Sequence, residues 1–263
     1  MEPWFGYAAS VFIGISLGLI GGGGSIITIP VLVYLFHIEP TLATTYSLFI
    51  VGSTSLVGGV QSAFNKTVDI KSALLLAIPS TTAVYFTRHF ILPHIPDTIL
   101  QTDNFSITGD MALMLFFAVI MIVASVRMIK GKQESEKHFT NHRYPVIILL
   151  GLVIGIVTGI VGAGGGFLVI PALVLFLGLP MKRALGTSLV VIAINSLIGV
   201  LGNLSLVREI NFEFLFTLNI LAVAGVFAGA YLTKFIEGKR LKSGFGWFAL
   251  VVALFIIVKE VRI

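Results

Sequence analysis

The residues of this chain best suited to hold a ligand are two runs of glycine, each followed by a short apolar segment. The first run is Gly21-Gly-Gly-Gly-Ser25 and the second is Gly162-Ala-Gly-Gly-Gly166. If a helix begins after each run, its first backbone N–H groups are free and no Cβ atom crowds them. A helix N-terminus carries about half a positive charge, so each run predicts a cradle for an anion. The alternative is that the glycines only allow helices to approach closely.

These two runs are equivalent parts of an internal repeat. At an offset of 141 residues, 10 of the 23 positions of Gly14–Phe36 are identical in Gly155–Leu177, and Pro30 recurs as Pro171. If the chain had only one glycine run, helix packing would be the favoured role. Because a glycine run stands at the matching place in both halves, anion binding is favoured instead. Paired halves with Gly- and Pro-interrupted segments in corresponding positions are typical of secondary transporters.

Hydroxyl and amide side chains follow each glycine run and could complete the coordination of an anion with neutral donors. Ser47 and Ser188 are the best candidates because they are a matched pair. The alternative for each is an ordinary interhelical hydrogen bond, worth about 1 kcal/mol or less. Ser80, Thr81 and Thr82 have no polar counterparts in the second half, so we expect them to pack. The predicted substrate-binding residues are Gly22, Gly23, Gly24, Ser25, Ser47, Gly164, Gly165, Gly166, Thr187, Ser188 and Asn195.

The composition is that of a membrane protein. Hydrophobic residues make up 57% of the 263 residues and charged residues 11%, whereas a soluble domain has about 25% charged residues. We therefore expect an all-α polytopic protein of the cell (plasma or inner) membrane. The net charge of +5 is expected to set the topology rather than to bind nucleic acid. Six segments have about the length of a crossing: Ala43–Phe64, Ser72–Leu92, Met111–Met128, Leu185–Leu206, Phe214–Phe235 and Ser243–Val258.

Each glycine-rich element is either one long broken crossing or a hairpin that enters the membrane and returns to the same side. The piece Ser25–Phe36 would be about 18 Å long as a helix, which is too short to cross. With two hairpins and the N-terminus outside, the cytoplasmic loops hold 13 of the 17 Lys and Arg residues, which favours hairpins. Each half then has a hairpin and three full crossings, and the odd number makes the two four-segment repeats inverted. The predicted units are a first transmembrane repeat over 1–130, a cytoplasmic linker over 131–144 and a second transmembrane repeat over 145–263.

Several kinds of chemistry are excluded by residues that the chain lacks. It has no cysteine, which excludes thiolate metal sites and cysteine nucleophiles. No histidine pair, carboxylate pair or Ser–His set falls at membrane depth. We therefore predict no catalytic residue, metal site or cofactor, and we do not expect an enzyme. No charged residue lies near the middle of a predicted crossing, which argues against a proton-carrying acid in the membrane.

The paired glycine-rich elements up to Pro30 and Pro171, followed by Ala184-Leu-Gly-Thr-Ser188, resemble the sulfite exporter TauE/SafE family of permeases over nearly the whole chain. The resemblance implies a multi-pass transporter of a small sulfur oxyanion or organosulfonate, such as sulfite or sulfoacetate. We expect this anionic substrate to be held at the glycine-rich helix N-termini and exported by alternating access. The alternatives are an anion channel of the same architecture and a membrane subunit that helps to assemble a larger complex. Besides the substrate, the expected partners are the lipid bilayer and, as an open alternative, further copies of the chain in a homo-oligomer.

Overall fold

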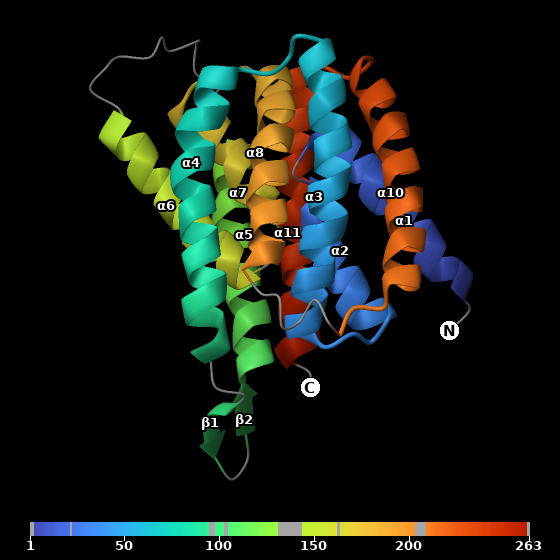
Figure 1. Cartoon of the computed structure of the whole chain (residues 1–263), viewed down its shortest axis with the longest axis vertical. Coiled ribbons are helices and arrows are strands. Elements are labelled where there is room, and N and C mark those ends of the chain that lie inside the picture. The colour runs from blue at the N-terminus through green and yellow to red at the C-terminus, as the bar shows by residue number, and fades with distance from the viewer. Residues whose placement is uncertain are drawn as a thin grey trace.

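Six long apolar helices make up most of the computed structural model (Figure 1). The structure describes residues 3–21, 23–94, 98–102, 105–130, 144–161, 164–202 and 209–261. As the sequence predicts, six helices are long and apolar enough to cross a membrane: α3 (Pro40–Phe64), α4 (Ile70–Phe86), α5 (Gly109–Lys130), α8 (Met181–Leu201), α10 (Phe212–Thr233) and α11 (Gly238–Val261). The π-helical turn η2 (Thr87–Ile91) and the 3₁₀ turn η3 (Leu92–His94) extend α4. The antiparallel strands β1 (Thr98–Thr102) and β2 (Phe105–Thr108) precede α5.

Some helices extend beyond the apolar segments because polar residues continue them. α8 begins at Met181, directly after its N-cap residue Pro180, and so includes Lys182 and Arg183. The sequence predicts the start at Leu185 instead. Hydrophobicity marks the part of a helix that lipid surrounds, whereas capping marks where the helix ends.

Each glycine-rich element forms two helices that are joined at the glycines. The segments are α1 (Pro3–Ile20), α2 (Gly23–Pro30) and the π-helical turn η1 (Val31–Leu35) in the first half, and α6 (Tyr144–Val161), α7 (Gly166–Pro171) and the π-helical turn η5 (Ala172–Phe176) in the second. Gly21 has a φ of 74°, and Gly164 and Gly165 have φ values of 63° and 74°. Residues with a Cβ atom rarely adopt this left-handed conformation. The helices therefore break at the glycines, as predicted.

A proline follows the glycines in both halves and determines how the short helix ends. Pro30 and Pro171 have no backbone N–H, so each removes one hydrogen bond of the α-helical pattern. The next turn widens to a π-helix in both halves. Phe36 N donates to Val31 O (3.3 Å), and the matching bond in the second half is 3.2 Å long. The local geometry thus follows the sequence repeat.

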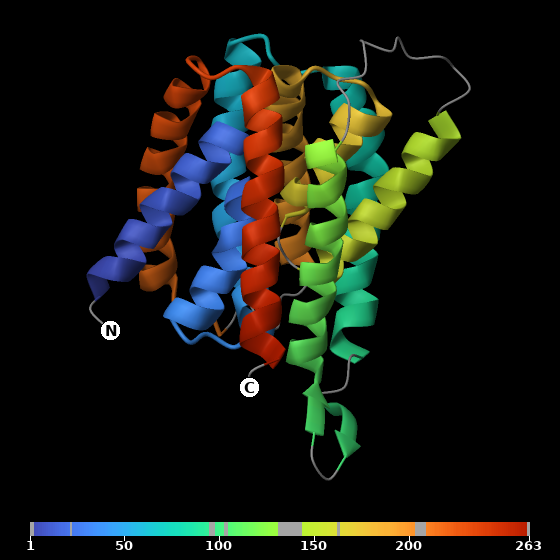
Figure 2. The ribbon, with the colours of Figure 1, turned by 180° about the vertical axis from the view of Figure 1, so that it is seen from behind.

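The two short helix pairs start at opposite ends of the bundle. In Figures 1 and 2 the N-terminus and the start of α3 lie at the lower end, whereas α6 and α8 begin at the upper end. α1 packs along α10 and α6 packs along α4, while α3 pairs with α8 and α5 pairs with α11. α8 is the most deeply buried of the six long helices, so its side chains are placed to form an internal site.

Glycines let the first helix of each short pair approach its neighbour closely. A methyl group at Gly14 would lie 1.9 Å from a backbone carbonyl oxygen of α10, and one at Gly155 would lie 2.2 Å from a carbonyl oxygen of α4. The glycines one turn further on, Gly18 and Gly159, contact the same two helices. Small residues are what allow helices to associate inside lipid. Close packing, the alternative to anion binding, therefore accounts for Gly18 and Gly159.

Large apolar side chains are exposed on the bundle. Ile220 is 69% exposed, Val251 63% and Leu149 62%. Extended apolar surfaces of this kind are rare on proteins that fold in water, whereas lipid tails solvate them well. The exterior therefore fits the hydrocarbon core of a bilayer.

Candidate functional site

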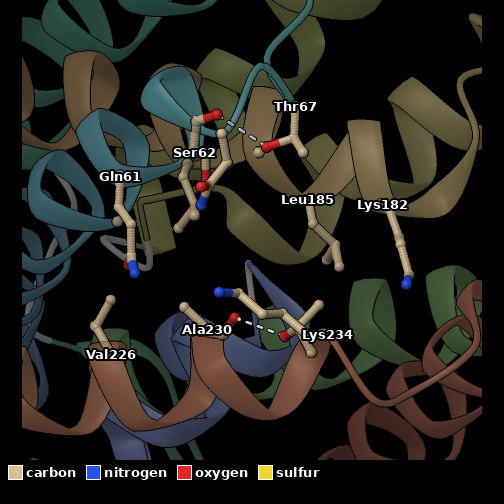
Figure 3. Close-up of a pocket in the computed structure, with 14 residues that line it drawn as sticks. Gln61, Ser62, Thr67, Lys182, Leu185, Val226, Ala230 and Lys234 are labelled. Atoms are coloured by element: carbon tan, nitrogen blue, oxygen red, sulfur yellow. Dashed lines mark hydrogen bonds between the residues drawn. The ribbon is translucent and has the colours of Figure 1, made fainter.

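A cavity of about 190 Å³ opens at the upper end of the bundle, between α1, α3, α8 and α10. We term it the vestibule. Figure 3 shows lining side chains from three of these helices: Gln61, Ser62 and Thr67 in and after α3, Lys182 and Leu185 of α8, and Val226, Ala230 and Lys234 in and after α10. The space remains open partly because four lining residues are small: Gly18, Gly58, Gly186 and Ala230.

The vestibule has an apolar wall that includes Leu185, Leu189 and Val226, and its polar lining side chains are positive or neutral. None of its lining residues in the described part of the chain is acidic. Lys182 and Lys234 are both exposed, and the other polar lining residues include Gln61 and Asn65. Gln61 Oε1 is buried without a hydrogen-bond partner among the described residues. Positive charge at a cleft raises the local concentration of anions. Amide and hydroxyl donors can then replace part of an anion's hydration shell.

The second glycine run lies against two buried hydroxyl groups. A methyl group at Gly164 would lie 2.4 Å from Ser196 Oγ, and one at Gly165 would lie 2.3 Å from Thr158 Oγ1. Both hydroxyls are fully buried, and neither has a hydrogen-bond partner in the part of the chain that the structure describes. An unsatisfied buried hydroxyl costs about 1–3 kcal/mol. A polar ligand at this place would remove that cost.

The first glycine run reaches α8 at a different level. A methyl group at Gly21 would lie 2.9 Å from Ser188 Oγ and 3.2 Å from Ile170 Cδ1 of α7. Ser188 and Ser196 are two helical turns apart, which is about 12 Å along α8. The structure thus brings Gly21 to Ser188 and Gly164 to Ser196, and it does not gather these four residues around one point.

The other predicted site residues have varied surroundings. Ser47 is fully buried, and its hydroxyl has no partner among the described residues. Thr187 Oγ1 accepts a hydrogen bond of 2.9 Å from the backbone N–H of Asp69, the N-cap residue of α4. Gly22 lies outside the described residues. The remaining predicted positions stand at the starts of the short helices: Gly23, Gly24 and Ser25 in α2, and Gly166 in α7.

Asn195 belongs to a hydrogen-bonded group that the sequence does not reveal. Its Oδ1 accepts from Ser80 Oγ (3.0 Å) and from Thr81 Oγ1 (2.6 Å), two hydroxyls of α4. Ser80 and Thr81, which were expected to pack, thus pack on α8 through interhelical hydrogen bonds. The donor Nδ2 of Asn195 is buried without a partner among the described residues. It is available to an anion or another acceptor.

Arg88 is a buried cation that sequence reasoning misses. It lies in η2, at the end of the α4 span, and its side chain is fully buried. Nε donates to Gly159 O (3.0 Å), Nη1 to Thr45 Oγ1 (3.4 Å) and Nη2 to Thr44 Oγ1 (2.8 Å). No acidic side chain of the described residues forms an ion pair with it. The signal that could have found it is a guanidinium inside an otherwise apolar span.

The groups gathered here are suited to binding an anion. They are ammonium, guanidinium, amide and hydroxyl donors, and they lie at different levels of the bundle, with the vestibule lysines at the upper end and Arg88 at the lower end. Within the described ranges, no three His, Asp or Glu residues come together in a group that could hold a metal ion.

Comparison with known proteins gives consistent matches. The family model described as Sulfite exporter TauE/SafE matches residues 7–256. A probable membrane transporter protein of Xylella fastidiosa (strain 9a5c) is 26% identical over 255 residues, covering 93% of this chain and 91% of the relative. The probable membrane transporter protein YdhB of Bacillus subtilis (strain 168) is 27% identical over 233 residues, covering 88% of this chain and 90% of the relative. No solved structure matches the chain.

A shorter match is closer in sequence. A probable membrane transporter protein of Methanocaldococcus jannaschii is 36% identical over 117 residues, which cover 42% of this chain and 43% of the relative. The family match and the six apolar helices agree on a multi-pass membrane protein that is surrounded by lipid and transports a small substrate. The chain belongs to the sulfite exporter TauE/SafE family of membrane transporters.

Proposed function

We propose that this protein is a permease for a small anion, specifically a sulfur oxyanion or organosulfonate such as sulfite or sulfoacetate, and that it exports the anion by alternating access. The vestibule carries the proposal: it is a cavity within a membrane bundle, with lysines at its opening and no acidic lining residue. The cell's inside-negative potential would drive a singly charged anion outward with about 2.3 kcal/mol per 100 mV. Export therefore needs no buried carboxylate to carry a proton.

A small apolar cluster separates the vestibule from the second glycine run. Leu189 and Val226 line the vestibule, and they form a buried cluster with Leu17, Val51 and Ile192. Val51 and Ile192 are also the neighbours of Gly164, since a methyl group there would lie 2.9 Å and 3.1 Å from them. We propose that this cluster blocks the pathway in the present conformation. The hydroxyls of Ser47 and Ser196, which have no partner among the described residues, and the glycine runs would then hold the anion once the cluster parts.

Contacts that exchange between the halves support two inverted repeats, 1–130 and 145–263, joined by the linker 131–144. If each helix is replaced by its counterpart in the other half, the α1–α10 contact becomes the α6–α4 contact and the α3–α10 contact becomes the α8–α4 contact. The α3–α8, α5–α11 and α2–α7 contacts each join two counterparts, so the replacement leaves them unchanged. Individual residues follow the same rule. A methyl group at Gly58 would touch Leu189 and Val226 at 3.2 Å, and one at the equivalent Gly199 would touch the equivalent Leu48 and Val84 at 3.1 Å.

The inverted arrangement predicts opposite labelling of two equivalent positions. Glu39 and Pro180 are the exposed N-cap residues of α3 and α8, and the chain has no native cysteine. In Glu39→Cys a membrane-impermeant maleimide should label intact cells, and in Pro180→Cys it should label only after the membrane is permeabilised. This orientation places the lysine-rich vestibule end in the cytoplasm. Labelling of both positions from the same side would rule out the inverted repeats.

Transport is tested with purified protein in liposomes on a solid-supported membrane. Sulfite, sulfoacetate, sulfate, chloride and lactate are applied in turn, and substrate-induced charge movement is recorded. We expect currents with one or two sulfur oxyanions or sulfonates. Saturable flux with counterflow would indicate a carrier, and flux without counterflow would indicate the channel alternative. Silence with every anion, from protein that is demonstrably folded, would reject the proposed function.

The vestibule lysines should raise the rate at low anion concentration. In the double variant Lys182→Gln/Lys234→Gln we expect several-fold lower flux of sulfite below saturation, because the local anion concentration falls. The difference should shrink at high ionic strength, where charges more than about 8 Å apart are screened. The matched control is Lys66→Gln/Lys239→Gln, which removes two cations outside the vestibule lining. Equal flux in both double variants would show that the anion does not pass through the vestibule.

A further inference from the structure

The vestibule has a counterpart at the opposite end of the bundle, and this counterpart is filled. The repeat pairs four vestibule residues with four residues at the lower end. Gly18 pairs with Gly159, Leu185 with Thr44 and Gly186 with Thr45 at an offset of 141. Ala230 pairs with Arg88 at an offset of 142, which also aligns Asp69 and Asn211, the N-cap residues of α4 and α10. The pairing holds in space. A methyl group at Gly18 would lie 2.8 Å from the backbone nitrogen of Ala230, and Arg88 Nε lies 3.0 Å from Gly159 O.

The side chain of Arg88 occupies the space that stays open around Ala230. It is fully buried, and a methyl group at Gly202 would lie 3.0 Å from its Cβ. Three groups on two helices hold its guanidinium: Thr44 and Thr45 in the first turns of α3, and the Gly159 carbonyl in α6. Arginine in place of alanine therefore accounts for one end being filled while the other is open.

Among the described residues, the acceptors of the Arg88 guanidinium are all neutral, although the group is charged and fully buried. A buried charge without a counter-charge is strongly unfavourable, because two hydroxyls and a carbonyl replace only part of its hydration. The guanidinium plane also matches the oxygens of a sulfonate or sulfite, which can accept two parallel hydrogen bonds. An oxyanion that reaches Arg88 would thus replace weaker acceptors and supply the missing negative charge. The π-helical turn at Thr87–Ile91 that carries Arg88 is a type of irregularity that is frequent at functional sites.

We propose that Arg88 is an anion-binding residue of the transport pathway at the end opposite the vestibule, and that its side chain plugs this end until an anionic oxygen replaces its bonds to Thr44, Thr45 and Gly159. The inference rests on the proposed function for the class of anion. This role of Arg88 adds a positive charge to the pathway and explains why only one end of the bundle is open. Alternating access then requires the Arg88 side chain to leave its acceptors when the lower end opens.

The plug is tested by cysteine accessibility at two equivalent positions, Leu48 and Leu189. Leu189 lines the vestibule although it is only 4% exposed, and Leu48 is fully buried at the plugged end. With Arg88 present, Leu189→Cys should react with a soluble maleimide and Leu48→Cys should be protected. In the Arg88→Ala background, Leu48→Cys should react at least about tenfold faster because the protected state no longer dominates. The rate at Leu189→Cys should not rise and is expected to fall, because alternating access closes the vestibule when the lower end opens. A rise at both cysteines would instead report a loosened bundle.

A second variant keeps the test decisive if Arg88→Ala does not fold. Thr44→Val keeps the shape of the side chain and removes the acceptor of the 2.8 Å bond, so it should also speed labelling of Leu48→Cys. Unchanged protection of Leu48→Cys in the folded variants, or equal labelling of both cysteines when Arg88 is present, would overturn the plug.

Anion binding is tested with methanesulfonate, a sulfonate that does not react with maleimide. It should accelerate labelling of Leu48→Cys when Arg88 is present, retain part of that effect in Arg88→Lys and have none in Arg88→Gln. The same acceleration in Arg88→Gln would overturn anion binding by Arg88. Cysteine labelling does not require transport, so failure of the role proposed for Arg88 can be distinguished from failure of the proposed transport function. Absence of transport with a working plug would reject the proposed function, whereas transport with unaltered labelling would reject only the role of Arg88.

Discussion

Replacing Gly164 by alanine is expected to abolish anion transport and to lower the thermal stability of the protein. The added methyl group would lie 2.4 Å from Ser196 Oγ and 2.9 Å from Val51 Cγ1, so the second glycine run must move away from α8 and α3. The φ of 63° at this position adds a cost of about 1–2 kcal/mol for a residue with a Cβ atom. Together with the overpacking, the loss of stability should be on the order of 2–4 kcal/mol. Thermal unfolding and flux of the purified variant measure the two effects.

Two further variants separate a local effect at Gly164 from a general effect of added volume. Gly244→Ala adds the same methyl group where no atom lies within 4 Å, and it should leave both stability and transport intact. Ser196→Gly in the Gly164→Ala background removes the nearest atom and should restore part of the stability, since only the backbone strain and the contacts with Val51 and Ile192 remain. Wild-type transport by Gly164→Ala would mean that the contact of this run with α8 is not needed for the pathway.

Replacing Gly14 by leucine is expected to prevent stable folding. The Cβ atom of the leucine would lie 1.9 Å from the carbonyl oxygen of Ala222 and 2.9 Å from the Ala222 Cα atom. These are backbone atoms of α10, so no side-chain rotation can relieve the overlap, and α1 must separate from the helix along which it packs. Helices inside lipid associate through close contact rather than through the hydrophobic effect, so the lost contact has no substitute. The yield of monodisperse protein after detergent extraction should fall to near zero.

The matched variants for Gly14 test whether the effect depends on the helix contact. Gly155→Leu, at the equivalent position, would meet the Ser80 carbonyl oxygen at 2.2 Å and should fail in the same way. Gly244→Leu enters open space and should be extracted normally. If Gly14→Leu behaves like Gly244→Leu, α1 does not pack on α10 as closely as described.

Much of the fold could be predicted from the sequence because the signals are local. The six crossing helices follow from runs of apolar residues, and the breaks at Gly21 and at Gly164 follow from the cost of glycine in a helix. The repeat at an offset of 141 residues also predicted that Pro30 and Pro171 would stand in the same place, and both precede a π-helical turn. At the glycines, the recurrence of the run favoured binding over packing, although both uses need the same absence of a Cβ atom.

The candidate site was predicted only in part. Ser47 and Gly164 were identified from the repeat, and the structure leaves the Ser47 hydroxyl and the Ser196 hydroxyl beside Gly164 without partners among the described residues. Thr187 was grouped with them, yet its hydroxyl accepts from Asp69 N. Whether these residues bind a substrate remains a prediction.

The sequence by itself determined the membrane environment, the repeat and the helix breaks, because each depends on composition or on residues close together in the chain. Only the tertiary structure decided which polar groups meet. Arg88 bonds to Thr44 and Gly159, 44 and 71 residues away, and Asn195 accepts from Ser80, 115 residues away. In the sequence, a cation near the end of an apolar segment has the same appearance as one that fixes topology at the membrane surface. Burial distinguishes the two, and burial is a property of helix packing rather than of any single helix.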